Sequence, residues 1–176
     1  GLDFARERVI LLTTHRRENW GAPMERIFEA VRQIIQGFSH TRVVFPVHRN
    51  PQIRELARAR LGDLDRVNLI EPPHYQEFAN LMAKSYFLIT DSGGLQEEAP
   101  SLGKPVLVLR DTTERPEGVQ AGTALMVGTH VEKITGEAKR LLTDQDVYHR
   151  MANAPNPYGD GKAAFRIAQI LWEGLA

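Results

Sequence analysis

The stretch Phe87-Leu-Ile-Thr-Asp-Ser-Gly-Gly94, followed by Leu95-Gln-Glu-Glu-Ala-Pro-Ser-Leu-Gly-Lys-Pro105, decides the fold of this chain. It predicts an apolar strand that ends near Thr90, and then a helix that two glycines open and Gly103 terminates. Backbone N–H groups at such a helix start have no partner and carry partial positive charge, so an anion can bind there. The two glycines have no Cβ, so a bulky phosphate can come close to the backbone.

The same segment also indicates what kind of anion it binds. Glu98 follows Ser92 by six residues and lies about one turn inside the helix, where it can accept hydrogen bonds from a sugar. A nucleoside diphosphate with its ribose fits this pattern. A simpler structure also fits, because Asp and Ser are ordinary N-caps and Gly-Gly can form a tight turn. The phosphate interpretation further requires the carboxylate of Asp91 to point away from the ligand.

The composition limits the possible partners. A length of 176 residues is enough for one domain with a real core, and 22 basic residues balance 22 acidic ones. We therefore expect neither nucleic acid nor a membrane as a partner. The chain has no cysteine, which fits a reducing compartment, and we expect a cytoplasmic location. The chain begins with Gly1 and residues 1–7 resemble the remnant of a linker, so we expect a fragment of a longer protein.

Strands and helices are predicted to alternate along the chain. The predicted strands cover residues 8–14, 42–47, 67–70, 86–90, 105–109 and 124–127. The predicted helices cover residues 23–37, 51–61, 75–84, 93–102, 130–143, 144–152 and 162–172. Because the strands are continuously apolar, a parallel sheet with helices on both faces is indicated. The expected fold is α/β: one Rossmann-like domain over residues 1–176 with a doubly wound, six-stranded parallel sheet.

Polar side chains follow five of the predicted strands. They are Thr13 to Arg17, His48 to Asn50, His74 with Tyr75, Asp91 to Gly94, and Arg110 to Arg115. In a parallel sheet the strands share one carboxyl edge, and ligands bind outside that edge. Loops are polar in any case, but repetition after five strands favours a ligand site at this edge.

Several other sites are not supported by the sequence. Three of the edge residues are histidines, but no His-x-His or His-Glu-x-x-His pairing places two ligands on one element, so we expect no metal site. The chain contains no Walker phosphate loop and no Gly-x-Gly-x-x-Gly after its first strand, which argues against an NTPase and against a nicotinamide site. It also lacks the Gly-x-Ser-x-Gly elbow of α/β-hydrolases.

Several motifs together identify a resemblance. They are His15-Arg-Arg-Glu-Asn-Trp-Gly21, Phe45-Pro-Val-His-Arg-Asn-Pro51, Thr90 to Pro105, Arg110-Asp-Thr-Thr-Glu-Arg-Pro-Glu117 and Asn156-Pro-Tyr-Gly-Asp-Gly161. Over nearly the whole chain these motifs closely resemble the bacterial non-hydrolysing UDP-N-acetylglucosamine 2-epimerases. The match covers the C-terminal half of such an enzyme, which has the two-domain glycosyltransferase-B fold. The spacing of Glu98, Gly103 and Pro105 is shared more loosely with glycosyltransferases of that fold.

The resemblance implies how the diphosphate and the ribose are held. Ser92, Gly93 and Gly94 would bind the diphosphate, and Arg115 would contact a phosphate. Glu98 would accept hydrogen bonds from the ribose hydroxyls. The implied ligands are UDP-GlcNAc and UDP, and no cofactor is expected.

Further roles are implied for residues at neighbouring strand ends. His15 would be the catalytic-site histidine, close to the departing diphosphate, while Phe78 and the backbone near Pro73 would border the uracil. Some bacterial members bind a second UDP-sugar as an activator between the domains. Arg16 and His48 are the matching positions for that site.

The resemblance also implies a reaction and partners. The enzymes interconvert UDP-GlcNAc and UDP-ManNAc: a proton leaves C2 while UDP leaves C1, and UDP then adds back. The acid and base at C2 come from an N-terminal domain that this sequence lacks, so we expect the fragment to be inactive alone. The helix within residues 162–176 is expected to dock on that missing domain. A homodimer is expected for the full-length protein.

Three rival interpretations stay open. The chain could be the donor-binding half of a glycosyltransferase, or a binding domain that senses nucleotide sugars without catalysis. A hydrolysing epimerase, which releases UDP and ManNAc, also fits the resemblance.

Overall fold

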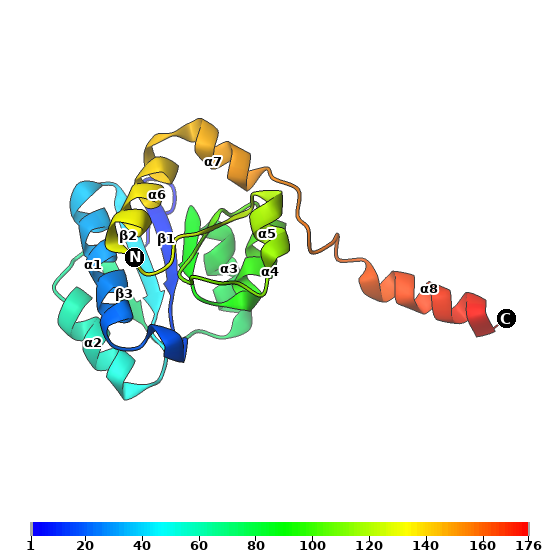
Figure 1. Cartoon of the computed structure of the whole chain (residues 1–176), viewed down its shortest axis with the longest axis horizontal. Coiled ribbons are helices and arrows are strands. Elements are labelled where there is room, and N and C mark those ends of the chain that lie inside the picture. Colours follow the sequence, from blue (N-terminus) through cyan, green and yellow to red (C-terminus); the bar gives the residue numbers. More distant parts are fainter. Residues whose placement is uncertain (1, 176) are drawn as a thin grey trace.

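A six-stranded parallel sheet forms the centre of the protein, as a computed structural model that describes residues 2–175 shows (Figure 1). The strands are β1 (Arg8–Thr13), β2 (Thr41–Pro46), β3 (Val67–Ile70), β4 (Phe87–Thr90), β5 (Val106–Val108) and β6 (Ala124–Met126). Their order in the sheet is β3-β2-β1-β4-β5-β6, and every pair is parallel. The predicted doubly wound fold is therefore confirmed.

This strand order creates a crevice between β1 and β4. The chain builds outward from β1 to β3, and then crosses back to place β4 on the other side of β1. The connections consequently leave β1 and β4 in opposite directions, which opens a crevice at their carboxyl ends. Thr13 pairs with Thr90 in the register, so the loops that follow these residues start side by side.

Helices cover both faces of the sheet (Figure 1). On one face lie α1 (Ala22–Gly37), α2 (Pro51–Leu61), α6 (Val131–Thr143) and α7 (Gln145–Ala152). The other face carries α3 (Tyr75–Lys84), α4 (Gly93–Ser101) and α5 (Pro116–Ala121). Successive strand residues point to opposite faces, so Ile10 and Leu12 pack toward α1 while Leu11 packs with α3 and α4.

Two short elements were not predicted. A 3-10 helix, η1 (Arg17–Asn19), follows β1, and α5 follows the loop after β5. Both are shorter than two helical turns, so neither has room for an apolar repeat in the sequence. All of the predicted strands and helices are present, and their ends differ from the prediction by at most a few residues. Within residues 1–7, predicted as linker, Glu7 forms an ion pair of 2.8 Å with Arg42 in β2.

Arg110 joins two loops at the carboxyl edge of the sheet. Its Nε donates to Glu18 at 2.7 Å, and its Nη2 donates to Glu114 at 3.0 Å. Only 6% of the Arg110 side chain is exposed, so the guanidinium is held between the two carboxylates. These contacts tie η1 after β1 to the loop after β5. The hydrogen bonds from Arg110 lower the pKa of Glu114 to about 2 from its ordinary 4.5.

The Asn156 to Gly161 motif includes a cap for α5. Gly118 is the third residue of α5, so its N–H has no carbonyl partner within the helix. The Tyr158 hydroxyl accepts a hydrogen bond from this N–H at 3.0 Å. A Cβ on Gly118 would lie 2.7 Å from that oxygen, so a larger residue there would push the Tyr158 hydroxyl away from the cap.

The last helix, α8 (Ala163–Leu175), extends away from the rest of the domain (Figure 1). Large apolar side chains on it are exposed, including Phe165 at 69% and Trp172 at 78%. Among residues 2–175, no helix has both the length and the apolar character that crossing a membrane requires.

We predict that the Arg110–Glu114 pair stabilises the folded state less in acid. The pKa of Glu114 is lower in the folded state, so the pair contributes fully above pH 4.5 and loses its contribution as the pH falls toward 2. The difference in free energy of unfolding between wild type and Glu114→Gln should therefore be constant above pH 4.5 and shrink below it. Urea unfolding at a series of pH values measures this difference.

A double substitution provides the control for this prediction. In an Arg110→Gln background, Glu114→Gln should show a clearly smaller decline, because the largest cause of the lowered carboxyl pKa is gone and only a backbone hydrogen bond and Arg16 still lower it. A difference that persists undiminished to pH 2 would contradict the assignment of the pair.

Candidate functional site

A cleft of about 270 Å³ lies at the crevice between β1 and β4. The side chains around it come from the ends of β1, β2, β3 and β4 and from the starts of α3 and α4. They are Thr13, Thr14, His15, Pro46, His48, Pro72, Pro73, Phe78, Ser92 and Leu95. Five of the residues predicted for the site therefore line one cleft, although they are up to 77 positions apart in sequence.

The N-terminus of α4 has features that suit an anion. Ser92 is the N-cap, but its side chain accepts no hydrogen bond from the first turn. A Cβ on Gly93 would lie 3.6 Å from Nη2 of Arg16, so this guanidinium stands beside the turn. The helix start thus combines free backbone N–H groups with a nearby positive charge. Both features favour a phosphate.

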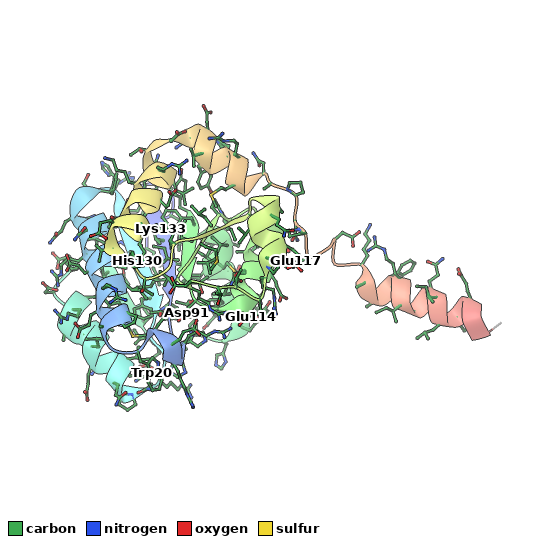
Figure 2. The ribbon with its side chains drawn as sticks, viewed as in Figure 1. Trp20, Asp91, Glu114, Glu117, His130 and Lys133 are labelled. Atoms are coloured by element: carbon green, nitrogen blue, oxygen red, sulfur yellow. The ribbon has the colours of Figure 1, made fainter. Side chains whose placement is uncertain are left out.

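The carboxylate of Asp91 points away from this turn, as a phosphate requires. Oδ2 of Asp91 accepts hydrogen bonds from the backbone N–H groups of His15 and Arg16, at 2.9 Å each. It also accepts from Thr14 Oγ1 at 2.9 Å and Asn19 Nδ2 at 3.0 Å. Figure 2 shows Asp91 inside the body of the domain. The acidic group therefore holds the loop after β1 instead of repelling a ligand.

Two histidines form one wall of the cleft. The rings of His15 and His48 stack with centroids 5.8 Å apart and planes inclined by 15°. Nδ1 of His15 lies 3.3 Å from Oδ1 of Asp91. His74 is exposed and does not line the cleft. Within residues 2–175, no group of three or more His, Asp or Glu side chains could hold a metal ion.

Glu98 lies next to the glycine turn. A Cβ on Gly94 would be 3.8 Å from Oε1 of Glu98, while Oε2 accepts a hydrogen bond from the Tyr75 hydroxyl at 3.1 Å. This hydrogen bond raises the pKa of Tyr75. The carboxylate is thus held within reach of a ligand on the turn, with Oε1 facing Gly94.

Arg115 is paired with Glu97 of α4 and is outside the lining of the cleft. The hydrogen bond to Glu97 raises the pKa of Arg115. Contact with a phosphate would require the guanidinium to turn from this carboxylate or to bind both groups.

Sequence reasoning missed the residues that hold these loops in place. Gln96 is fully buried; its amide donates to the Ser92 carbonyl at 3.2 Å and accepts from the Thr113 hydroxyl at 2.7 Å. Thr113 Oγ1 in turn accepts from the backbone N–H of Arg115 at 3.0 Å. Thr14 and Asn19, which bind Asp91, were also missed as individual residues. The sequence signal that could have identified these residues is a polar side chain close to a motif glycine or to a strand end.

A larger hollow of about 430 Å³ lies between α1 and α2. Arg60 and Glu25, which line it, form an ion pair of 3.1 Å. The hollow contains none of the residues predicted for the site, and the cleft at the crevice is therefore the candidate site.

Comparisons with known proteins agree on one family. The family model described as UDP-N-acetylglucosamine 2-epimerase matches residues 2–172. The UDP-N-acetylglucosamine 2-epimerase of Bacillus subtilis (strain 168) is 60% identical over 165 residues, which cover 94% of this chain and 43% of that protein.

Solved structures extend the agreement to the fold. The S. aureus MnaA–UDP co-structure is 51% identical with a TM-score of 0.93, and the match covers 98% of this chain and 47% of that one. The UDP-GlcNAc 2-epimerase from Neisseria meningitidis bound to UDP-GlcNAc is 45% identical, with a TM-score of 0.90 over 95% of this chain and 45% of that one. The glycotransferase of kitacinnamycin, 17% identical with a TM-score of 0.66, shares the fold alone.

The chain spans about half the length of the relatives it matches. Its six-stranded parallel sheet and the share of the relatives that it covers fit the C-terminal half of a glycosyltransferase-B fold. On the family match, the sequence identities and the shared fold, the chain belongs to the UDP-N-acetylglucosamine 2-epimerase family.

Proposed function

We propose that the complete protein interconverts UDP-GlcNAc and UDP-ManNAc, and that this chain supplies the half that binds UDP. The observation that carries the proposal is the uncapped N-terminus of α4, which faces a cleft that His15 lines. Membership of the epimerase family adds the identity of the nucleotide sugar. The S. aureus relative is a complex with UDP, and the Neisseria relative is bound to UDP-GlcNAc.

In the proposed reaction, a base removes the proton on C2 while the C1–O bond breaks and its electron pair leaves with UDP. The product of this step is a 2-acetamidoglucal. UDP then adds back to C1 while a proton reaches C2 from the other face, which inverts that carbon. Negative charge on the diphosphate grows as UDP departs. The N–H groups at Gly93 and Gly94, with His15 and Arg115, stabilise that charge in a cleft partly shielded from water.

The nucleoside part of UDP occupies the remaining surface. Glu98 accepts hydrogen bonds from the ribose hydroxyls, since its Oε1 faces the glycine turn. Phe78 and Pro73 line the cleft with apolar surface, and the uracil lies against them. The exposed Tyr75 hydroxyl, which contacts Glu98, holds the carboxylate when no ribose is bound.

The acid and base at C2 come from another domain of the complete protein. The relatives are about twice as long as this chain, which leaves room for such a domain. We assign α8 to the contact with it, because the apolar side chains Phe165 and Trp172 stand exposed on a helix away from the domain body (Figure 1). The chain alone then binds UDP without catalysing the reaction. A homodimer and a cytoplasmic location belong to the same proposal.

A second UDP-sugar that acts as an activator is proposed to contact Arg16 and His48. Arg16 stands beside Gly93, and the ring of His48 stacks on that of His15. An activator bound there would lie directly next to the reacting UDP-sugar.

Supplying UDP-GlcNAc alone to the complete protein tests the reaction. We expect UDP-ManNAc to form without an acceptor, and deuterium to enter C2 in heavy water. Release of UDP with free ManNAc would instead indicate a hydrolysing enzyme, and a requirement for an acceptor would indicate a glycosyltransferase. The purified 176-residue chain should incorporate no deuterium. Incorporation by that chain would refute the assignment of the C2 chemistry to another domain.

The ribose contact predicts a weaker affinity in Glu98→Ala. Loss of a charged hydrogen-bond acceptor should cost about 1–3 kcal/mol, or roughly 5- to 150-fold in Kd for UDP. Isothermal titration calorimetry on the 176-residue chain measures the Kd for UDP. Glu55→Ala is the matched control, because it removes the same charge from an exposed position on α2 and should leave Kd unchanged. Equal affinities of wild type and Glu98→Ala would remove Glu98 from the ribose site.

A further inference from the structure

Asp91 has two carboxylate oxygens in very different surroundings. Oδ2 accepts four hydrogen bonds of 2.9–3.0 Å from the loop after β1, from Thr14, His15, Arg16 and Asn19. These contacts hold the carboxylate in one orientation. Since the Asp91 side chain is 0% exposed, water does not compete for it.

The other oxygen, Oδ1, is buried and accepts no hydrogen bond from the described residues. Nδ1 of His15 lies 3.3 Å from it, just beyond the usual range of about 2.7–3.2 Å for an N–H···O hydrogen bond. A buried acceptor without a donor is rare and calls for an explanation. A proton on Nδ1 of His15 would supply the donor that Oδ1 lacks.

We propose that Asp91 is a positioning residue that holds His15 in the tautomer with its proton on Nδ1. A neutral imidazole has one N–H donor and one acceptor nitrogen. With the proton on Nε2, the lone pair of Nδ1 would face the buried oxygen of Asp91, and both groups would lack a donor. With the proton on Nδ1, the two groups match, and the Nε2 lone pair lies on the opposite edge of the ring.

The tautomer determines which ring nitrogen of His15 can contact a ligand. The ring is 42% exposed, lines the cleft, and is stacked on His48, so Nε2 is the nitrogen available to a ligand. Any proton that the ring gains must enter at Nε2, which then donates into the cleft. That this Nε2–H group donates to a departing diphosphate rests on the proposed function. The tautomer of His15 is independent of the proposed function, because Asp91 determines it in the absence of a ligand.

Long-range ¹H–¹⁵N correlation spectra of the ligand-free 176-residue chain test the inference. At alkaline pH, where imidazole is neutral, His15 should show the Nδ1–H tautomer. In Asp91→Asn the amide oxygen can keep the four loop hydrogen bonds, while the amide nitrogen donates to Nδ1. His15 should then change to the Nε2–H tautomer. A wild-type His15 in the Nε2–H form would overturn the proposal, and this outcome needs no variant.

Thr14→Val provides the matched control. It removes one donor to Oδ2 and leaves the contact between Oδ1 and His15 in place. His15 should keep the Nδ1–H tautomer in this variant. If Thr14→Val changes the tautomer as Asp91→Asn does, or if neither variant changes it, Asp91 does not set the tautomer. Because no ligand is present, these results do not depend on whether the protein binds UDP.

Discussion

The structure of the site depends on the buried carboxylate of Asp91. This group follows β4, yet its hydrogen bonds go to the loop after β1, so it joins the two strands at the point where the strand order reverses. Its orientation has two effects. It brings His15 and Arg16 beside the start of α4, and it keeps its own negative charge away from the proposed phosphate position. Without that orientation, the glycine turn would carry an acidic group where an anion should bind.

Much of the fold follows from local sequence. The apolar strands and the strict alternation with helices were sufficient to predict the six-stranded parallel sheet. The shared carboxyl edge of the sheet also predicted that His15, His48 and Ser92 lie together, whereas Phe78, which lines the same cleft, was implied only by the family resemblance. Local patterns were insufficient for η1 and α5, because helices of three and six residues have no repeat to detect. In α5 the cap is the Tyr158 hydroxyl, a residue 40 positions away.

The contacts that complete the site are also distant in sequence. Arg110 reaches Glu18 across 92 positions, and Gln96 reaches Thr113 across 17. Such pairs depend on how loops meet at the sheet edge, which no spacing in the sequence specifies. The pairing of Arg115 with Glu97 was unforeseen for the same reason. Arg110, Gln96 and Thr113 hold the loops in place, whereas other residues of the same motifs, such as Ser92 and Glu98, lie where the proposed ligand binds.

The chemical groups of this domain indicate which part of the proposed reaction it carries out. In the proposal, this domain offers the backbone N–H groups of Gly93 and Gly94, together with Arg115 and His15, to the diphosphate. The proton transfers at C2 belong to the domain on which we propose that α8 docks. In this proposal, the chain is one half of an active site, and its own contribution is electrostatic.

The central claim is that the first turn of α4 binds the diphosphate of UDP. Residue-resolved NMR of the 176-residue chain, titrated separately with UDP, pyrophosphate and uridine, tests it most directly. UDP and pyrophosphate should both shift the backbone amide signals of Gly93, Gly94 and Leu95, because these N–H groups gain an anionic acceptor. Uridine should shift signals near Phe78 and leave the three amides unchanged. Binding of UDP that leaves the signals of Gly93 and Gly94 in place would contradict the account.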